Sequence, residues 1–229
     1  MSAHPIPQQD LIRLVYTRLF IGVLIMILIL FLPAGTLAYW QAWVYLGCLV
    51  IPMLIVLNFW LRKDPELLER RMRMREKEVA QKKIIRASYF IFPLFFLLPG
   101  FDYRFGWSSV PVWLVIIADC IVLIGYGLFV LTIRENRFAS RIIEVQNGQR
   151  VITTGPYSLV RHPMYLGVML IYFLTPLALG SYWALLISIW ILPILAARII
   201  NEEKVLERDL PGYLEYQQKT RYRIIPGIW

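Results

Sequence analysis

The stretch Val151-Ile-Thr-Thr-Gly-Pro-Tyr-Ser-Leu-Val-Arg-His-Pro-Met-Tyr-Leu-Gly167 changes from a polar, turn-forming segment into the start of an apolar helix. Gly155-Pro156 is a turn signal. Pro163 suits the first position of a helix, because its missing N–H would have no partner there in any case. His162 is then the expected N-cap, and the helix start presents N–H groups that attract anions. A simpler interpretation is that Arg161 and His162 only face lipid head groups.

The composition on both sides of this stretch is that of an integral membrane protein. Of the 229 residues, 59% are hydrophobic and 17% charged, and the mean hydropathy is +0.59. Soluble domains are about half apolar and about a quarter charged. The first apolar run is too long for a signal peptide, and no small-residue cleavage site follows it. The net charge of +9 fits loops that face anionic lipid, and no nucleic-acid motif occurs.

We predict an all-α integral membrane protein with about six transmembrane helices, the last two forming a hairpin. The predicted spans are 16–32, 39–61, 87–99, 110–133, 164–179 and 182–197. The fifth is short for a span at about 1.5 Å per residue. Residues 62–86 hold ten basic and five acidic side chains and are interpreted as a solvated surface helix, with head-group binding as a second possibility.

The basic residues also predict the orientation of the spans. Of 24 Lys and Arg residues, 23 fall on one side of this topology when Arg18, at the start of the first span, is counted there, and Arg104 alone falls on the other. By the positive-inside rule, both termini and the basic loop 62–86 are therefore expected to be cytoplasmic.

This topology gathers polar residues that are distant in sequence. Gly180 is the turn of the last hairpin; His162 lies 18 residues before it and Glu202 lies 22 after it. An antiparallel hairpin therefore returns Glu202-Glu203 to the membrane face of the 151–167 stretch. The end of the fourth span, with Gly125-Tyr-Gly127, faces the same side. We therefore expect a cytoplasmic pocket formed by the C-terminal half.

The candidate chemical groups each have a plain structural alternative. Arg198 and Glu202 share a helix face and form either part of a ligand site or an ordinary ion pair. Gly125 and Gly127 permit either close helix packing or room for a ligand. Asp119, at membrane depth, is either functional or neutral and hydrogen-bonded, and is left outside the site. No metal-ligand spacing, catalytic triad or phosphate-binding loop occurs, so metal and hydrolase chemistry have no support.

The C-terminal motifs resemble the isoprenylcysteine carboxyl methyltransferases. Arg161-His-Pro-Met-Tyr-Leu-Gly167 carries the resemblance, together with Gly155-Pro-Tyr157 before it and Glu202-Glu203 after it. The tail Leu210-Pro-Gly-Tyr-Leu-Glu-Tyr216 is similar to theirs as well. The resemblance covers about residues 134–229. In the wider superfamily, phospholipid N-methyltransferases use a Gly-x-Gly and a Glu-Glu pair to bind S-adenosylmethionine, and Gly125-Tyr-Gly127 and Glu202-Glu203 resemble that pair.

The resemblance implies a lipid-modifying, S-adenosylmethionine-dependent methyltransferase, most simply a carboxyl O-methyltransferase of an isoprenylcysteine-type acceptor. By this resemblance, Arg198 is the catalytic residue and binds the substrate carboxylate together with Arg161. It implies that the cofactor contacts are Gly125, Gly127, Gln149, Arg150, Val151, Ile152, Tyr157, His162, Pro163, Met164, Tyr165, Glu202 and Glu203. Gln149-Arg150 departs from the polar pair that the family often has there.

We expect the chain to divide into two parts. The N-terminal transmembrane helices occupy residues 1–109, with the basic loop 62–86, and the methyltransferase-like core occupies residues 110–229. Three other functions stay open at this point. Phospholipid N-methylation is one, and non-catalytic lipid binding is another. The third is an NADPH-dependent membrane reductase, for which Arg134, Arg137, Arg141 and Arg150 would hold the phosphates.

Overall fold

The computed structural model describes residues 7–72, 79–139 and 142–229, and every regular element within them is a helix. The elements are α1 (Gln8–Ala34), α2 (Trp40–Lys63), α3 (Pro65–Met72), α4 (Val79–Phe105), α5 (Val112–Glu135), the short 3₁₀ helix η1 (Gly155–Ser158), α6 (Pro163–Ala178), α7 (Trp183–Ser188), α8 (Ile191–Asp209) and α9 (Tyr213–Lys219). The prediction of an all-α fold is confirmed.

Four described helical stretches are long and apolar enough to cross a membrane: α1, α2, α5 and the stretch Trp183–Asp209 that holds α7 and α8. A helix also covers each of the other two predicted spans. Of these, α6 is a shorter apolar helix of 16 residues, as its sequence indicated. The other, α4, begins at Val79, so part of the charged segment 62–86 belongs to it, part forms α3, and residues 73–78 lie outside the described ranges.

The last predicted span is interrupted in the structure, a break that was not predicted from the sequence. One helix was expected over 182–197, whereas α7 ends at Ser188 and α8 begins at Ile191. Pro193 explains the break, because it has no N–H to bond the carbonyl of Ile189 four residues before it. Two short-range bonds, from Trp190 to Ile187 and from Leu192 to Ile189, tighten the chain there instead.

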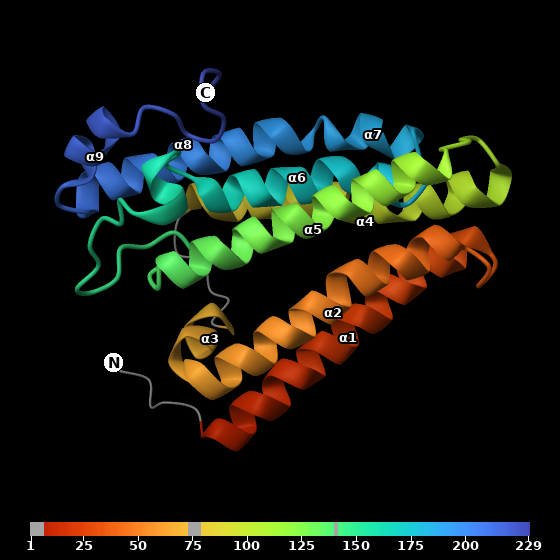
Figure 1. Ribbon diagram of the computed structural model, residues 1–229, viewed down its shortest axis with the longest axis horizontal. Coiled ribbons are helices and arrows are strands. Elements are labelled where there is room, and N and C mark those ends of the chain that lie inside the picture. Colours follow the sequence, from red (N-terminus) through yellow and green to blue (C-terminus); the bar gives the residue numbers. More distant parts are fainter. Residues whose placement is uncertain (1–6, 73–78, 140–141) are drawn as a thin grey trace.

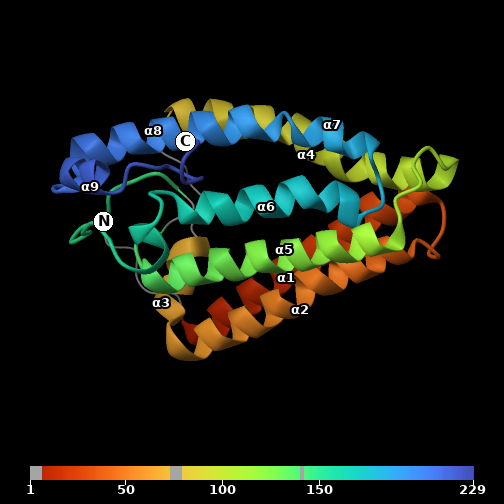
Figure 2. The ribbon, with the colours of Figure 1, turned by 45° about the horizontal axis from the view of Figure 1, so that its top comes forward.

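Helices α5, α6 and α8 run alongside one another, and the α1–α2 pair approaches α5 at one end and diverges from it toward α3 (Figures 1 and 2). The contact between α5 and α6 is unusually close. A Cβ built on Gly125 would lie 2.8 Å from the carbonyl oxygen of Gly167, and one on Gly167 would lie 2.6 Å from that of Gly125. Two glycines facing each other therefore set the distance between these helices.

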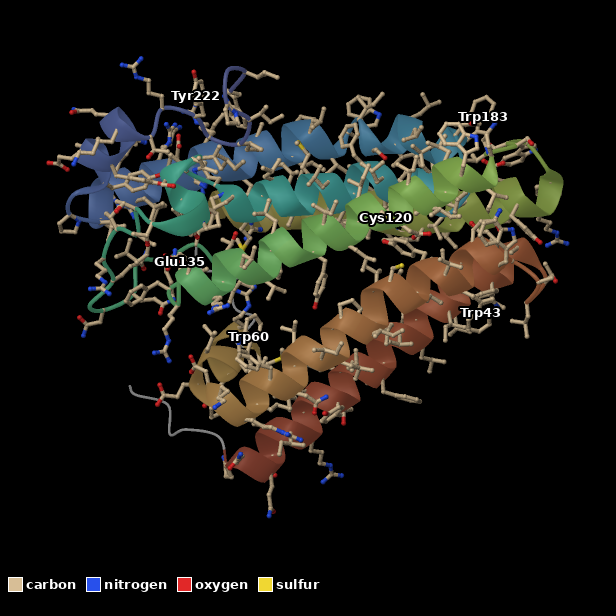
Figure 3. All side chains as sticks on the ribbon, in the orientation of Figure 1. Trp43, Trp60, Cys120, Glu135, Trp183 and Tyr222 are labelled. Carbon is tan, nitrogen blue, oxygen red and sulfur yellow. The ribbon has the colours of Figure 1, made fainter. Side chains whose placement is uncertain are left out.

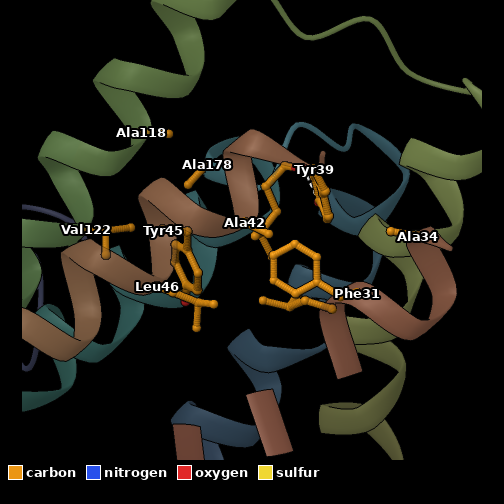
Figure 4. Packing of buried hydrophobic residues seen from close by; sticks show 11 residues of the cluster. Phe31, Ala34, Tyr39, Ala42, Tyr45, Leu46, Ala118, Val122 and Ala178 are labelled. Carbon is orange, nitrogen blue, oxygen red and sulfur yellow. Dashed lines mark hydrogen bonds between the residues drawn. The ribbon is translucent and has the colours of Figure 1, made fainter. Parts of the chain in front are cut away.

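A buried apolar cluster joins α1 and α2 to α5 and to the end of α6 (Figure 4). Within it, the Tyr39 hydroxyl donates to the Leu179 carbonyl at 2.5 Å, and the Tyr45 hydroxyl lies 2.8 Å from Thr175 Oγ1. These bonds satisfy polar groups that would be costly to bury alone. They fix the N-terminal hairpin to the last turn of α6 and to Leu179, which follows it.

The two ends of the helices differ in chemistry. Trp43 and Trp183 lie toward the end that holds the α1–α2 turn, while Trp60 and Glu135 lie toward the opposite end (Figure 3). Large apolar side chains such as Ile124, 63% exposed, face outward between the ends. Exposed apolar surface on this scale is expected where lipid replaces water. Helices α3 and α9 and the polar residues 136–139 and 142–162 gather at the second end, where the candidate site lies (Figure 1).

Candidate functional site

The segment before α6 folds as its sequence predicts. Gly155-Pro156 opens the short helix η1, His162 is the N-cap of α6, and Pro163 occupies the first turn. The two residues before the helix are held by a distant part of the chain. The Arg161 N–H donates to the Tyr222 carbonyl at 2.9 Å, and the His162 N–H to the Arg223 carbonyl at 2.8 Å. The C-terminal tail therefore pins the start of α6.

Glu203 is buried beneath this helix start and contacts three basic side chains. One carboxylate oxygen accepts from Arg161 Nε at 2.7 Å and lies 3.2 Å from His162 Nε2. The other accepts from Arg223 Nε at 2.7 Å. The Glu203 side chain is 3% exposed and that of Arg161 is 7% exposed. A charge this deeply buried needs such partners, so Glu203 joins α8, the start of α6 and the tail.

Glu202, the neighbouring acid, belongs to a different network. Its carboxylate accepts from the Tyr165 hydroxyl at 2.6 Å, and that hydroxyl accepts from Arg198 Nε at 2.8 Å. The Tyr165 hydroxyl therefore links the predicted pair Arg198 and Glu202. This arrangement places a guanidinium one helical turn along α8 from the Glu202 carboxylate.

A cavity of about 90 Å³ lies on the other side of Glu202, between the start of α6, the 136–157 segment and α9. Ten predicted site residues line it: Gln149, Arg150, Val151, Ile152, Tyr157, Arg161, His162, Met164, Tyr165 and Glu202. The hairpin argument therefore placed Arg161, His162 and Glu202 correctly at one cavity.

Five other predicted positions are absent from the described wall of the cavity: Gly125, Gly127, Pro163, Arg198 and Glu203. Gly125 is occupied in the contact with Gly167, and a Cβ built on Gly127 would meet no described atom within 4 Å. The packing interpretation of this Gly-x-Gly therefore has direct support for Gly125. Glu203 is taken up by its three basic partners.

The rest of the cavity wall was missed from the sequence. It consists of Asn136, Phe138, Ala139, Ile142, Ile143, Glu144, Leu206, Leu210, Tyr213 and Tyr216. Tyr213 and Tyr216 stand in the 210–216 motif that carried part of the resemblance, and that motif was the available signal. The loop residues have no regular pattern from which a wall could be predicted.

Tyr213 is the most informative of these additional residues. It is 4% exposed, and its hydroxyl has no partner among the described residues. Burial raises its pKa well above the ordinary value, and the nearby Glu203 and Glu202 raise the pKa further. Burial likewise raises the pKa of Tyr216 to about 12. Tyr213 therefore presents a neutral hydroxyl that can bond a ligand.

Of the arginines proposed to hold NADPH phosphates, only Arg150 lies on the described wall of the cavity. Arg137 pairs instead with Asp64 at 2.5 Å, outside the cavity. Arg134 is in the last turn of α5, and Arg141 lies outside the described residues. The described wall therefore offers little to a phosphorylated dinucleotide.

Residues 113–210 match the family model of phospholipid methyltransferase. The match contains α5, α6, α8 and most of the cavity wall. That family is part of the isoprenylcysteine and phospholipid methyltransferase superfamily, which the C-terminal motifs of this chain resemble. No curated protein matches the chain. The match supports a membrane methyltransferase acting on lipid-like substrates as the function of residues 113–210.

Proposed function

We propose that the protein transfers a methyl group from S-adenosylmethionine to a lipid-like acceptor in the bilayer. The single observation that carries this proposal is the cavity between Glu202 and the unpartnered Tyr213 hydroxyl, which lies at the polar end of membrane helices in the superfamily segment. A water-soluble donor and a membrane-bound acceptor can meet only at such a boundary.

The division of the chain into residues 1–109 and 110–229 stays a prediction.

The residues present fit the donor chemically. Glu202 and Glu144 supply carboxylates for a molecule with a sulfonium and an ammonium group, and Tyr213, Tyr216 and Tyr157 supply aromatic surface and hydroxyls. The cavity is smaller than the volume of about 300 Å³ or more that small-molecule sites usually have. We therefore expect the irregular wall at 142–152 to move outward when the donor binds.

The chemical demand on the protein is modest. The bound donor supplies a methyl group that is already activated by the positive sulfur. The chain supplies orientation, and aligned reactants gain about 7–11 kcal/mol from proximity alone. Glu202, held by Tyr165 and Arg198, is fixed rather than free to rotate. A fixed carboxylate holds a cationic ligand in one position.

The acceptor that we favour is a carboxylate of the isoprenylcysteine type. Such a carboxyl has a pKa of about 3.5, so it is already an anion at neutral pH and needs no base. His162, the histidine within the described residues, is 4% exposed in its side chain and lies against Glu203, so it is not placed to remove a proton from an amine. Arg198 lies beside Tyr165 and orients the anion. The family match itself favours the second candidate, a phospholipid amine.

We expect the donor site to respond to Glu202 and Tyr213. Glu202→Gln removes a charged hydrogen-bond acceptor and should weaken binding about tenfold or more, whereas Tyr213→Phe removes one neutral bond and should weaken it a few-fold, about 2–12 times. Calorimetric titration of purified protein with S-adenosylhomocysteine measures both. Glu207→Gln, an exposed acid one turn further along α8, is the matched control.

Two outcomes would contradict this donor site. One is wild-type affinity in both variants, and the other is tight binding of NADPH in place of S-adenosylhomocysteine. His162→Ala offers an additional check, because that side chain also lines the cavity.

The pH profile distinguishes the two acceptors. With a carboxylate acceptor, methyl transfer should be nearly flat between about pH 6 and 8, because neither the acceptor nor the buried Tyr213 and Tyr216 titrates there. Arg198→Ala should raise KM strongly under the same conditions. A rate that increases steeply with pH on phosphatidylethanolamine would instead support the amine acceptor. A primary amine has a pKa of about 10 and must lose a proton before it can accept the methyl group.

A further inference from the structure

A second, larger hollow lies away from the candidate site. It has a volume of about 670 Å³ and is a groove between α1 and α2 that α3 closes at one end. The described lining comes from α1 between Val15 and Met26, from α2 between Leu46 and Leu57, and from Arg71 and Met72 of α3. Apart from two arginines, these lining side chains are apolar or glycine. The α1–α2 pair that lines the groove diverges from α5 toward α3 (Figure 1).

The two charged residues of the lining are both basic and lie at the same end. Arg18 Nη1 donates to the Met72 carbonyl at 2.9 Å, which holds α1 against α3. Arg71 Nη1 donates to the Ala139 carbonyl at 2.7 Å, and its guanidinium lies 5.5 Å from the centre of the Phe129 ring. Each side chain is thus held in place, and the described lining contains no acid.

The groove is nearly as long as one leaflet is thick. From Arg18, at the α3 end, to Met26 the lining of α1 covers eight residue steps, which is about 12 Å at 1.5 Å per residue. The hydrocarbon of one leaflet is about 15 Å thick, half of the bilayer core. An acyl chain whose head group stands at α3 would therefore fill the groove along its length.

We propose that this groove binds an anionic glycerophospholipid, with an acyl chain between α1 and α2 and its phosphate against Arg18 and Arg71. Planar guanidinium groups bind phosphate oxygens in pairs, and basic pockets between membrane helices on the cytoplasmic side attract acidic head groups. The basic distribution predicts that α3 lies on that side. This lipid is a resident ligand, distinct from the methyl acceptor, and the proposal goes beyond the proposed function.

The binding also has a structural consequence for the candidate site. Arg71 bonds Ala139, which forms part of the wall of the first cavity. A phosphate that holds Arg71 therefore also steadies that wall.

The test is native mass spectrometry of the purified protein after incubation with phosphatidylglycerol or phosphatidylcholine, without a methyl donor. We expect phosphatidylglycerol to be retained in preference. Arg18→Ala and Arg71→Ala should each reduce its retention about tenfold, equivalent to about 1.4 kcal/mol. Arg62→Ala is the charge-matched control, because Arg62 is exposed at the same end of α2 and is not part of the described lining.

A second pair of variants tests the acyl chain without touching a charge. Gly22 lines the groove, and a Cβ built on it would meet no described atom within 4 Å; the same is true of Gly47, which is outside the described lining. Gly22→Leu should therefore abolish retention, and Gly47→Leu should leave it unchanged. Both replace a helical glycine and should keep or raise the melting temperature.

Equal retention of the two lipids would overturn the proposal and leave only general contact with the bilayer. Unchanged phosphatidylglycerol retention in folded Gly22→Leu would overturn it as well. Because no donor or acceptor is present, these outcomes are independent of the methyl-transfer test.

Discussion

At the scale of single residues, Glu203 has the most severe predicted phenotype. Glu203→Ala leaves the Arg161 guanidinium, 7% exposed, without its carboxylate. Breaking a buried ion pair by removing one partner typically costs about 3–5 kcal/mol. We therefore expect a large drop in melting temperature in detergent. Glu207→Ala, which removes an exposed acid from the same helix, should change stability by less than about 0.5 kcal/mol.

A Glu203→Ala variant that melts like the wild type and has lost only donor binding would assign Glu203 to the ligand instead. The two neighbouring acids therefore give opposite expectations. Glu202 variants lose binding with little loss of stability, and Glu203 variants lose stability first. From the sequence, Glu202 shares a helix face with Arg198, and the resemblance assigns both acids to the cofactor. The burial of Glu203 among Arg161, His162 and Arg223 could not be predicted, because it depends on contacts with distant parts of the chain.

At the scale of elements, the contact between α5 and α6 predicts different stability changes when each glycine of Gly125-Tyr-Gly127 is replaced. Gly125→Ala places a Cβ 2.8 Å from the Gly167 carbonyl oxygen and should cost about 1–3 kcal/mol, despite the better helix propensity of alanine. Gly127→Ala meets no described atom within 4 Å and should stabilise the helix by about 1 kcal/mol. Thermal denaturation measures both changes.

The same pair of variants also tests the role implied by resemblance. If Gly127→Ala weakens S-adenosylhomocysteine binding while raising stability, Gly127 is a cofactor contact after all. Unchanged affinity would restrict the Gly-x-Gly to packing.

At the scale of the whole molecule, the orientation in the membrane is open to a direct measurement. The basic residues predict that Lys63 and Lys219 lie on the cytoplasmic side and Ser109 on the opposite side. Single cysteines at these positions, in a chain without Cys48 and Cys120, should react accordingly with a membrane-impermeant maleimide. Labelling of positions 63 and 219 from opposite sides would reject the topology.

Much of this architecture was predictable from the sequence, and the reasons are physical. Apolar runs of about 20 residues identify spans, and Pro163 and Gly180 mark where the last hairpin begins and turns. The break before α8 and the role of Tyr213 depend on tertiary contacts that no local pattern records. Asp119 is a further example. It is 4% exposed, and neither carboxylate oxygen has a partner among the described residues, whereas one alternative from the sequence was a hydrogen-bonded carboxyl.

The C-terminal tail that holds the start of α6 also determines when, during synthesis, the cavity can be completed. Arg161 bonds the carbonyl of Arg221, which is synthesised 60 residues later, or about 3–12 s at ribosomal rates. The membrane helices before that point can insert and pack on their own apolar surfaces. The Arg161 side of the pocket, however, stays incomplete through that interval, so a nascent chain occupies the bilayer before it can hold the proposed methyl donor. A chain shortened to end before residue 220 would remain in this early state, inserted but inactive.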